Sequence, residues 1–139
     1  MGEIMKSDAV LVLETGQTFP ARRFGAGGEI SAELVFTTAM VGYVETLTDP
    51  SYHGQIVVQT FPLIGNYGVM AADFESESPR LSAYIVRQYC ETPSNFRCEE
   101  DLNGYLKKSG IIGLAGLDTR ALTRILREKG VMNAAIMNE

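Results

Sequence analysis

The first half of the chain alternates short apolar runs with turn-forming residues, which is typical of β-rich segments. The run DAVLVL at residues 8–13 precedes a Glu14-Thr15-Gly16 turn, and the segment QTFPARRFG follows, so the pattern predicts a hairpin. Pro20 lies in the returning strand and has no backbone N–H, which predicts a place at a sheet edge or a bulge. Further strands are predicted in the first part of residues 32–47 and within residues 54–61, 81–89, 111–117 and 131–137.

Two later segments, residues 98–110 and 118–130, have the apolar period of amphipathic helices. Asp118 is a natural N-cap for the second, and Gly110 and Gly130 end the two helices. The predicted buried stripes are Leu102, Tyr105 and Leu106 in the first helix, and Leu122, Ile125 and Leu126 in the second. About six or seven strands and two main helices therefore predict an α/β fold, arranged as a layered β/β/α domain with crossover units near the C-terminal end.

Composition agrees with one ordinary globular domain. The 139 residues are 45% hydrophobic and 21% charged, and 17 acidic residues exceed 12 basic ones, so no general positive field attracts nucleic acid or an anionic membrane. Cys90 and Cys98 do not have the spacing of a redox pair or half a zinc site, which indicates reduced thiols in a cytosolic protein. No apolar run approaches the ~18–20 residues of a membrane span.

Candidate catalytic chemistry is sparse. The only histidine, His53, follows Ser51 by two residues, and in an extended segment the two side chains would point the same way, as a Ser–His dyad needs. Neither cysteine lies in a nucleophile elbow, and no metal-binding pattern occurs. The residues alone therefore favour a module with exposed loops and no catalytic apparatus of its own.

Two surface features are candidates for binding. Residues 48–52, TDPSY, form a turn stiffened by Pro50 between two apolar segments, and a simple turn and a binding loop have the same pattern. Arg120, Arg124 and Arg127 have the i, i+4, i+7 spacing of one helix face, which suits an acidic partner surface. The alternative is a solvated helix face in which Arg124 pairs with Glu128.

Several stretches together resemble one family, the small (glutamine-hydrolysing) subunit of carbamoyl-phosphate synthase, in its N-terminal domain. The resemblance runs from about residue 9 to residue 136 and includes VGYVETLTDPSY, FPLIGNYG and GLDTRALTRILREKG. Val41, Thr37 and Phe61 stand where the family usually has threonine, asparagine and tyrosine, respectively. The family's domain is described as a swivelling β/β/α fold.

The resemblance implies a division of labour. In the family, a downstream class I glutamine amidotransferase domain hydrolyses glutamine, and ammonia travels through a tunnel to a large synthetase subunit. That subunit, where ATP and Mg or K ions are expected, makes carbamoyl phosphate from ammonia, bicarbonate and ATP for arginine and pyrimidine biosynthesis. This chain, residues 1–139, is then the N-terminal domain alone, without the amidotransferase domain.

For the residues of this chain, the resemblance implies a supporting role. Ser51 matches the serine that the family's domain lends to the glutamine pocket, whereas no residue matches the catalytic cysteine or histidine. A hydroxyl both donates and accepts hydrogen bonds, which suits the polar groups of glutamine. The expected roles are docking on the large subunit, shaping the ammonia route and contributing Ser51, with no catalysis and no cofactor or metal in this domain.

Two alternatives stay open. One is a free-standing binding or assembly module that keeps the fold without an amidotransferase partner. The other is a small hydrolase using Ser51 and His53. For Ser51 itself, the alternative role is a turn hydroxyl that bonds its own backbone.

Overall fold

The structure, a computed structural model, describes residues 7–38, 47, 50–60, 81–87 and 96–138, with the side chains of 96–102 excepted. These residues form seven strands: β1 (Ala9–Leu13), β2 (Thr18–Gly25), β3 (Ile30–Thr37), β4 (Ile56–Gln59), β5 (Ala83–Ile85), β6 (Ile112–Ala115) and β7 (Met132–Asn138). The helices within the described ranges are α2 (Phe96–Ser109) and α3 (Thr119–Lys129), and a 3-10 turn, η1, spans Pro50–Tyr52. The predicted α/β class, with about six or seven strands and two main helices, is confirmed.

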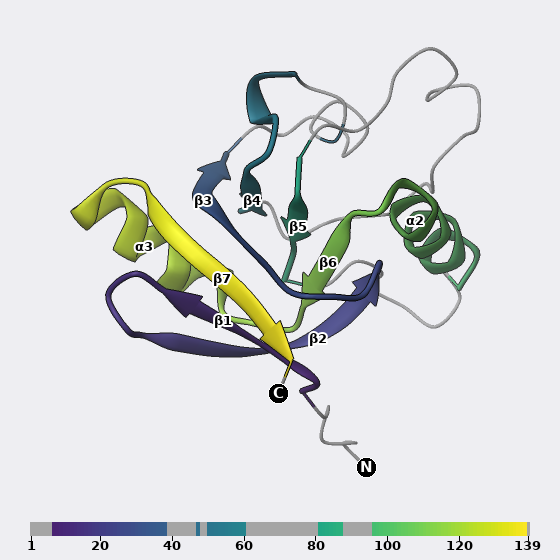
Figure 1. Cartoon of the computed structure of the whole chain (residues 1–139), viewed down its shortest axis with the longest axis horizontal. Helices are drawn as coiled ribbons and strands as arrows, with labels where there is room; N and C mark the ends of the chain where they lie inside the picture. Colours follow the sequence, from purple (N-terminus) through teal and green to yellow (C-terminus); the bar gives the residue numbers. More distant parts are fainter. Residues whose placement is uncertain (1–6, 39–46, 48–49, 61–80, 88–95, 139) are drawn as a thin grey trace.

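The seven strands close into one barrel in the order β1-β2-β6-β5-β4-β3-β7, and β7 pairs with β1 to complete the circle (Figure 1). The pairs β3–β4, β4–β5 and β5–β6 are parallel, and the other four pairs are antiparallel. Two groups of strands thus face each other across the barrel, and α2 packs on the outside of one group. This is the layered β/β/α arrangement that the sequence predicted.

The predicted N-terminal hairpin is present, and Pro20 occupies the kind of position expected of it. β1 and β2 pair antiparallel, with Val10 opposite Pro20. On its other side, β2 pairs with β6 only from Arg22 onward. Pro20 therefore lies on a stretch of β2 that has one neighbouring strand in the described part of the chain, so its missing N–H costs no ladder hydrogen bond there.

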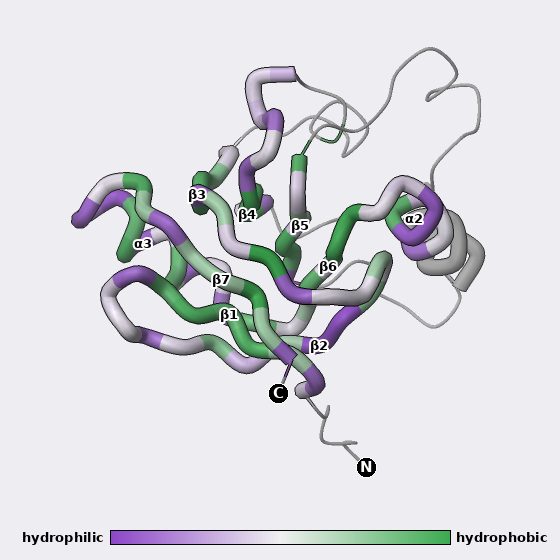
Figure 2. Tube along the Cα trace, in the orientation of Figure 1, coloured by the Kyte–Doolittle hydropathy of each residue, from purple (hydrophilic) through white to green (hydrophobic). Residues whose placement is uncertain are grey.

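The apolar side chains divide into an interior cluster and an outer cluster (Figure 2 colours the chain by hydropathy). The interior cluster gathers inward-facing residues of all seven strands with Leu122 and Leu126 of α3. The outer cluster packs Val57 and Tyr84 of the central strands against Leu106 of α2. Because β4, β5 and β6 are covered on both faces, every residue in them is buried, as is usual for parallel strands.

The segment from β5 through α2 to β6 is a parallel crossover, as predicted, and α2 packs on β2 and β6. Two glycines permit the close approach of β2 to β6 and α2. A Cβ on Gly25 would lie 2.7 Å from the Ile111 carbonyl oxygen, and one on Gly113 would lie 2.8 Å from the Phe24 ring. The Gly25 N–H donates to Asn103 Oδ1 at 2.6 Å, which fixes α2 to the end of β2.

The α3 helix begins and ends as its sequence predicts. The Asp118 carboxylate accepts from the Ala121 N–H at 3.0 Å, and Gly130, at φ 85°, donates its N–H to the Leu126 carbonyl. The following strand does not return to β6; β7 runs antiparallel between β1 and β3. The second crossover unit predicted near the C-terminal end is therefore wrong, because β7 is needed to close the barrel.

Some predictions concern residues outside the described part of the chain. These include Asp49, Cys90, the end of the strand at 88–89 and the side chains of Cys98 and Leu102. Gly110 has the positive φ, 76°, of the expected helix-ending glycine. Among the described residues, no helix has the length and apolar content needed to cross a membrane.

Candidate functional site

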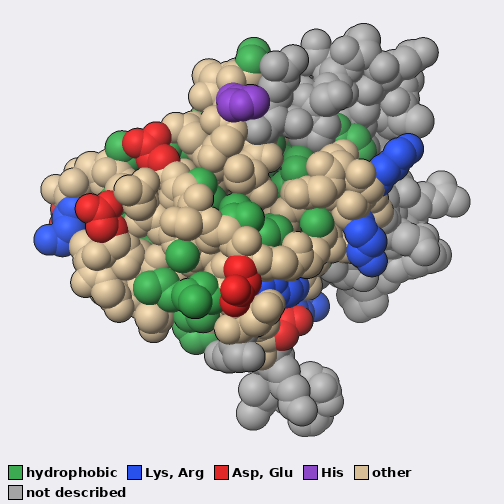
Figure 3. Space-filling model, in the orientation of Figure 1, with side chains coloured by type: hydrophobic (Ala, Val, Ile, Leu, Met, Phe, Trp, Pro, Cys, Tyr) green, Lys and Arg blue, Asp and Glu red, His purple; other side chains and the backbone are tan. Residues whose placement is uncertain are grey.

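The TDPSY loop is described from Pro50 onward and turns as a 3-10 helix directly before β4. The His53 N–H donates to the Pro50 carbonyl at 3.2 Å, and the Gln55 N–H donates to the Tyr52 carbonyl at 3.0 Å. The Ser51 and His53 side chains are both exposed, and Figure 3 shows the histidine in purple at the surface. A Ser51–His53 dyad requires an extended segment, so the 3-10 turn removes the geometric basis of that alternative.

This loop is tied to the barrel on both sides of Ser51. Half-buried Tyr52 packs against the outer cluster, in which Leu47 is fully buried. Gln55 donates from Nε2 to Glu33 Oε1 of β3 at 2.6 Å, and its carbonyl accepts from the Ser82 N–H at 2.8 Å. Ser51 is thus presented to solvent from a turn whose following residues are fixed to the sheet, a suitable support for a binding hydroxyl.

The predicted arginine stripe is exposed along α3 and borders a hollow. Arg120, Arg124 and Arg127 line about 300 Å³ of space together with Thr123 of the same helix and Thr60, which follows β4. The Arg127 guanidinium carbon lies 5.6 Å from the centroid of the Phe36 ring, in cation–π geometry. Across the described residues, no ion pair between Arg124 and Glu128 is present, so the pairing assumed for a merely solvated face is absent.

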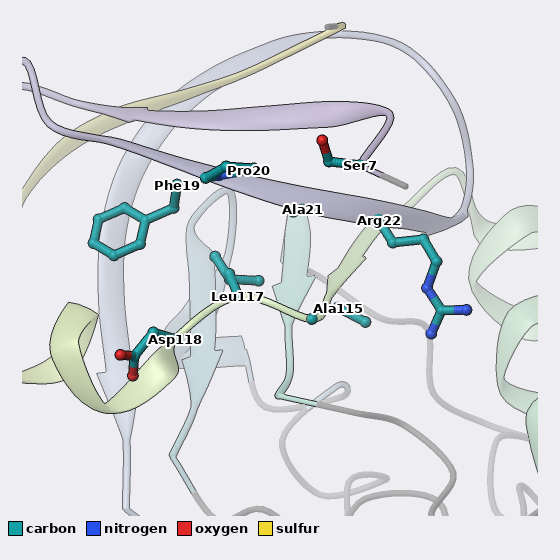
Figure 4. A pocket seen from close by; sticks show the side chains of 9 residues that line it. Ser7, Phe19, Pro20, Ala21, Arg22, Ala115, Leu117 and Asp118 are labelled. Atoms are coloured by element: carbon teal, nitrogen blue, oxygen red, sulfur yellow. The ribbon is translucent and has the colours of Figure 1, made fainter. Parts of the chain in front are cut away.

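Sequence reasoning missed a second hollow, of about 360 Å³, beside the open stretch of β2 (Figure 4). Its walls are Phe19 and Pro20 of β2 and Leu117 before α3, and charged Arg22 and Asp118 lie at its margins. Pro20 was the available signal, because a proline within a strand marks the place where a sheet opens. The other wall comes from residues about 100 positions away, which local patterns do not reveal.

Within the described ranges, one tyrosine has a clearly shifted pKa. Burial raises the pKa of the half-buried Tyr105 from 10.0 to about 12, and a hydrogen bond with Ser109 acts in the opposite direction. Among the described residues, no three metal-ligating side chains gather at one place. The arrangement suits a barrel domain that presents a rigid polar loop and a basic helix face to other groups.

Comparisons with known proteins identify the family. Residues 11–136 match the family described as carbamoyl-phosphate synthase small chain, CPSase domain. The carbamoyl phosphate synthase small chain of Clostridium perfringens is 52% identical over 129 residues, which cover 93% of this chain and 37% of the relative. The small chain of Syntrophotalea carbinolica is 50% identical over 128 residues, covering 92% and 34%.

The chain therefore belongs to the carbamoyl-phosphate synthase small-chain family, as the sequence resemblance indicated. It spans just over a third of the length of these curated relatives. The matched region contains Ser51 and all three arginines of the α3 stripe.

Proposed function

We infer that this chain is the non-catalytic N-terminal domain of the small subunit of glutamine-dependent carbamoyl-phosphate synthase. In this proposal, a downstream class I amidotransferase domain supplies the nucleophile that hydrolyses glutamine, and Ser51 of this domain binds the glutamine. The supporting observation is the family match over residues 11–136, within which Ser51 is exposed on a turn anchored to the barrel.

The wider assembly follows from the same assignment. Ammonia passes along a route shaped in part by this domain to the large synthetase subunit, which uses ATP with Mg or K ions. The complete enzyme is a C–N ligase that makes carbamoyl phosphate for arginine and pyrimidine biosynthesis in the cytoplasm. This domain binds no cofactor or metal itself, and alone it does not hydrolyse glutamine.

Docking on the large subunit is assigned to the exposed face of α3. Arg120, Arg124 and Arg127 form the basic surface of that contact, and the small and large subunits form a heterodimer. The support is physical: three guanidinium groups line one hollow, and none of the described residues lining it is acidic.

The role of Ser51 is tested in the full small chain, paired with its large subunit. Ser51→Ala is expected to raise KM for glutamine several-fold, because one binding hydroxyl is lost, while synthesis from added ammonia stays unchanged. Ser31→Ala, at an exposed position on β3, is the matched control. An unchanged KM in Ser51→Ala would contradict the assignment and return Ser51 to a turn residue.

The predicted inactivity of the isolated domain has a separate test. Ammonia release from glutamine by the purified 139-residue chain is expected to equal the buffer rate. Release that disappears on Ser51→Ala or His53→Ala would instead support a small hydrolase.

A further inference from the structure

The hollow beside α3 contains unbalanced positive charge in a chain that is acidic overall. Its lining includes Arg120, Arg124 and Arg127 and no carboxylate among the described residues, whereas the whole chain has a formal net charge of -5. The three side chains are exposed, so no burial requirement explains their gathering. Solvent-exposed guanidinium groups lining one hollow are suited to bind an anion with several oxygens.

The other residues of the hollow do not offer donors. The Thr60 hydroxyl donates to the Thr37 carbonyl at 2.9 Å, and the Thr123 hydroxyl donates to the Thr119 carbonyl at 2.7 Å. The Thr60 N–H also donates to the Thr37 carbonyl, at 3.1 Å. Hydrogen bonds from the hollow to an occupant therefore come from the guanidinium groups.

The three arginines are not equivalent. Arg127 lies over the Phe36 ring of β3, which restricts its guanidinium at one end of the hollow. For Arg120 and Arg124, no such ring contact is present in the described structure. The restricted guanidinium of Arg127 and the two less restricted guanidinium groups of Arg120 and Arg124 together suit an elongated partner with more than one carboxylate.

The spacing also limits the occupant. Residues 120 and 127 are seven positions apart, which is about 10 Å along a helix axis. An acidic helix or extended segment of a protein presents carboxylates over that length, while a single phosphate does not span it.

We propose that the hollow formed by Thr60, Thr123 and the three arginines is a carboxylate-binding notch, which takes an acidic segment of the large subunit through forked Arg120 and Arg124 contacts. The partner's identity rests on the proposed function; the notch itself rests on the geometry. Forked recognition separates this proposal from general electrostatic attraction, because a lysine keeps the charge and loses the fork.

The test uses the full small chain and the large subunit, with the dissociation constant measured at several salt concentrations. Arg124→Glu is expected to weaken assembly roughly tenfold, and Arg124→Lys roughly threefold, in line with exposed charge pairs. Lys108→Glu, at an exposed position on α2, changes the net charge equally and is the matched control. It should leave assembly nearly unchanged.

Equal effects of Arg124→Glu and Lys108→Glu would overturn the notch as the docking element while leaving the heterodimer intact. Arg124→Lys with unchanged affinity would overturn forked recognition. If no heterodimer forms with the unmodified chain, the proposed function fails, and citrate titration of the 139-residue chain by NMR then decides the notch. Arginine Nε–H shifts that Arg124→Glu abolishes would support a carboxylate site, and their absence would refute it.

Discussion

Gly25 ends β2 where α2 and β6 approach it most closely, and Gly25→Ala should therefore be strongly destabilising. The residue has φ 73°, where a side chain costs about 1–2 kcal/mol. Its Cβ would lie 2.7 Å from the Ile111 carbonyl oxygen and 2.9 Å from Leu106 Cβ, and such crowding typically costs about 1–3 kcal/mol. Lower entropy of the unfolded chain offsets about 0.4–1 kcal/mol, so the free energy of unfolding should fall by about 3 kcal/mol.

For 139 residues, this loss corresponds to a decrease in Tm of about 10 °C, from the usual entropy of unfolding per residue. The measurement is urea unfolding followed by far-UV circular dichroism, since the chain has no tryptophan. Three other glycines separate the two causes. Gly28 has φ 112° and nothing within 4 Å of an added Cβ, so the stability loss of Gly28→Ala measures backbone strain alone. Gly113 is crowded by the Phe24 ring, so Gly113→Ala measures crowding alone. Gly27 has neither feature, and Gly27→Ala is the control.

Gly25→Ala should lower the free energy of unfolding by more than Gly28→Ala or Gly113→Ala does. Gly27→Ala should leave it nearly unchanged. If Gly25→Ala and Gly28→Ala differ by less than about 0.5 kcal/mol, within the usual error of additivity, the close contact between β2, β6 and α2 does not exist in solution. A change in the urea slope would indicate an altered denatured state instead.

Three further predictions concern the core and one ionisable group. Leu122→Ala should lower the free energy of unfolding by about 2–5 kcal/mol, because Leu122 is fully buried in the interior cluster. Ile125→Ala, at a half-buried position, should lower it by less. Equal losses for the two variants would contradict the packing of α3. Tyr84→Phe removes a buried hydrogen bond to Gln59 Oε1 of 3.1 Å and should cost about 1–2 kcal/mol, measured by the same unfolding assay. Burial raises the pKa of Tyr105 to about 12, so its neutral form favours folding; that stability is complete below pH 10 and is lost as the pH rises towards 12. Tyr105→Phe should remove one high-pH step from the phenolate absorbance titration, and an unchanged titration would refute the shift.

Local structure followed closely from the sequence where one segment contains the whole signal. In α3, the apolar spacing identified Leu122 and Leu126, which are buried, and Ile125, which is half-buried. The Asp118 carboxylate caps the helix as its position indicated. Each of these features depends on residues within four positions of one another.

Closure of the barrel depends on pairings between distant strands, and these could not be predicted locally. β7 pairs with β1, more than 100 residues earlier, because its alternate side chains are needed in the interior cluster. The arginine spacing was visible in the sequence, but Thr60, which lines the hollow, follows β4, and Phe36, whose ring lies under Arg127, belongs to β3. When a site is assembled from several elements, the local sequence pattern reveals only the residues that lie on one of them, here the arginines of α3.

The incomplete pairing of β2 has a consequence for contact between copies of the chain. In the described residues, the closed circle offers no full-length strand edge to which a second molecule could add a strand. The stretch of β2 before Arg22 pairs with β1 alone, as residues 30–33 of β3 pair with β7 alone, and in the β2 stretch Pro20 presents no N–H donor. At the opening beside β2, Pro20 therefore removes one of the N–H donors that an added strand of a second molecule would need for pairing.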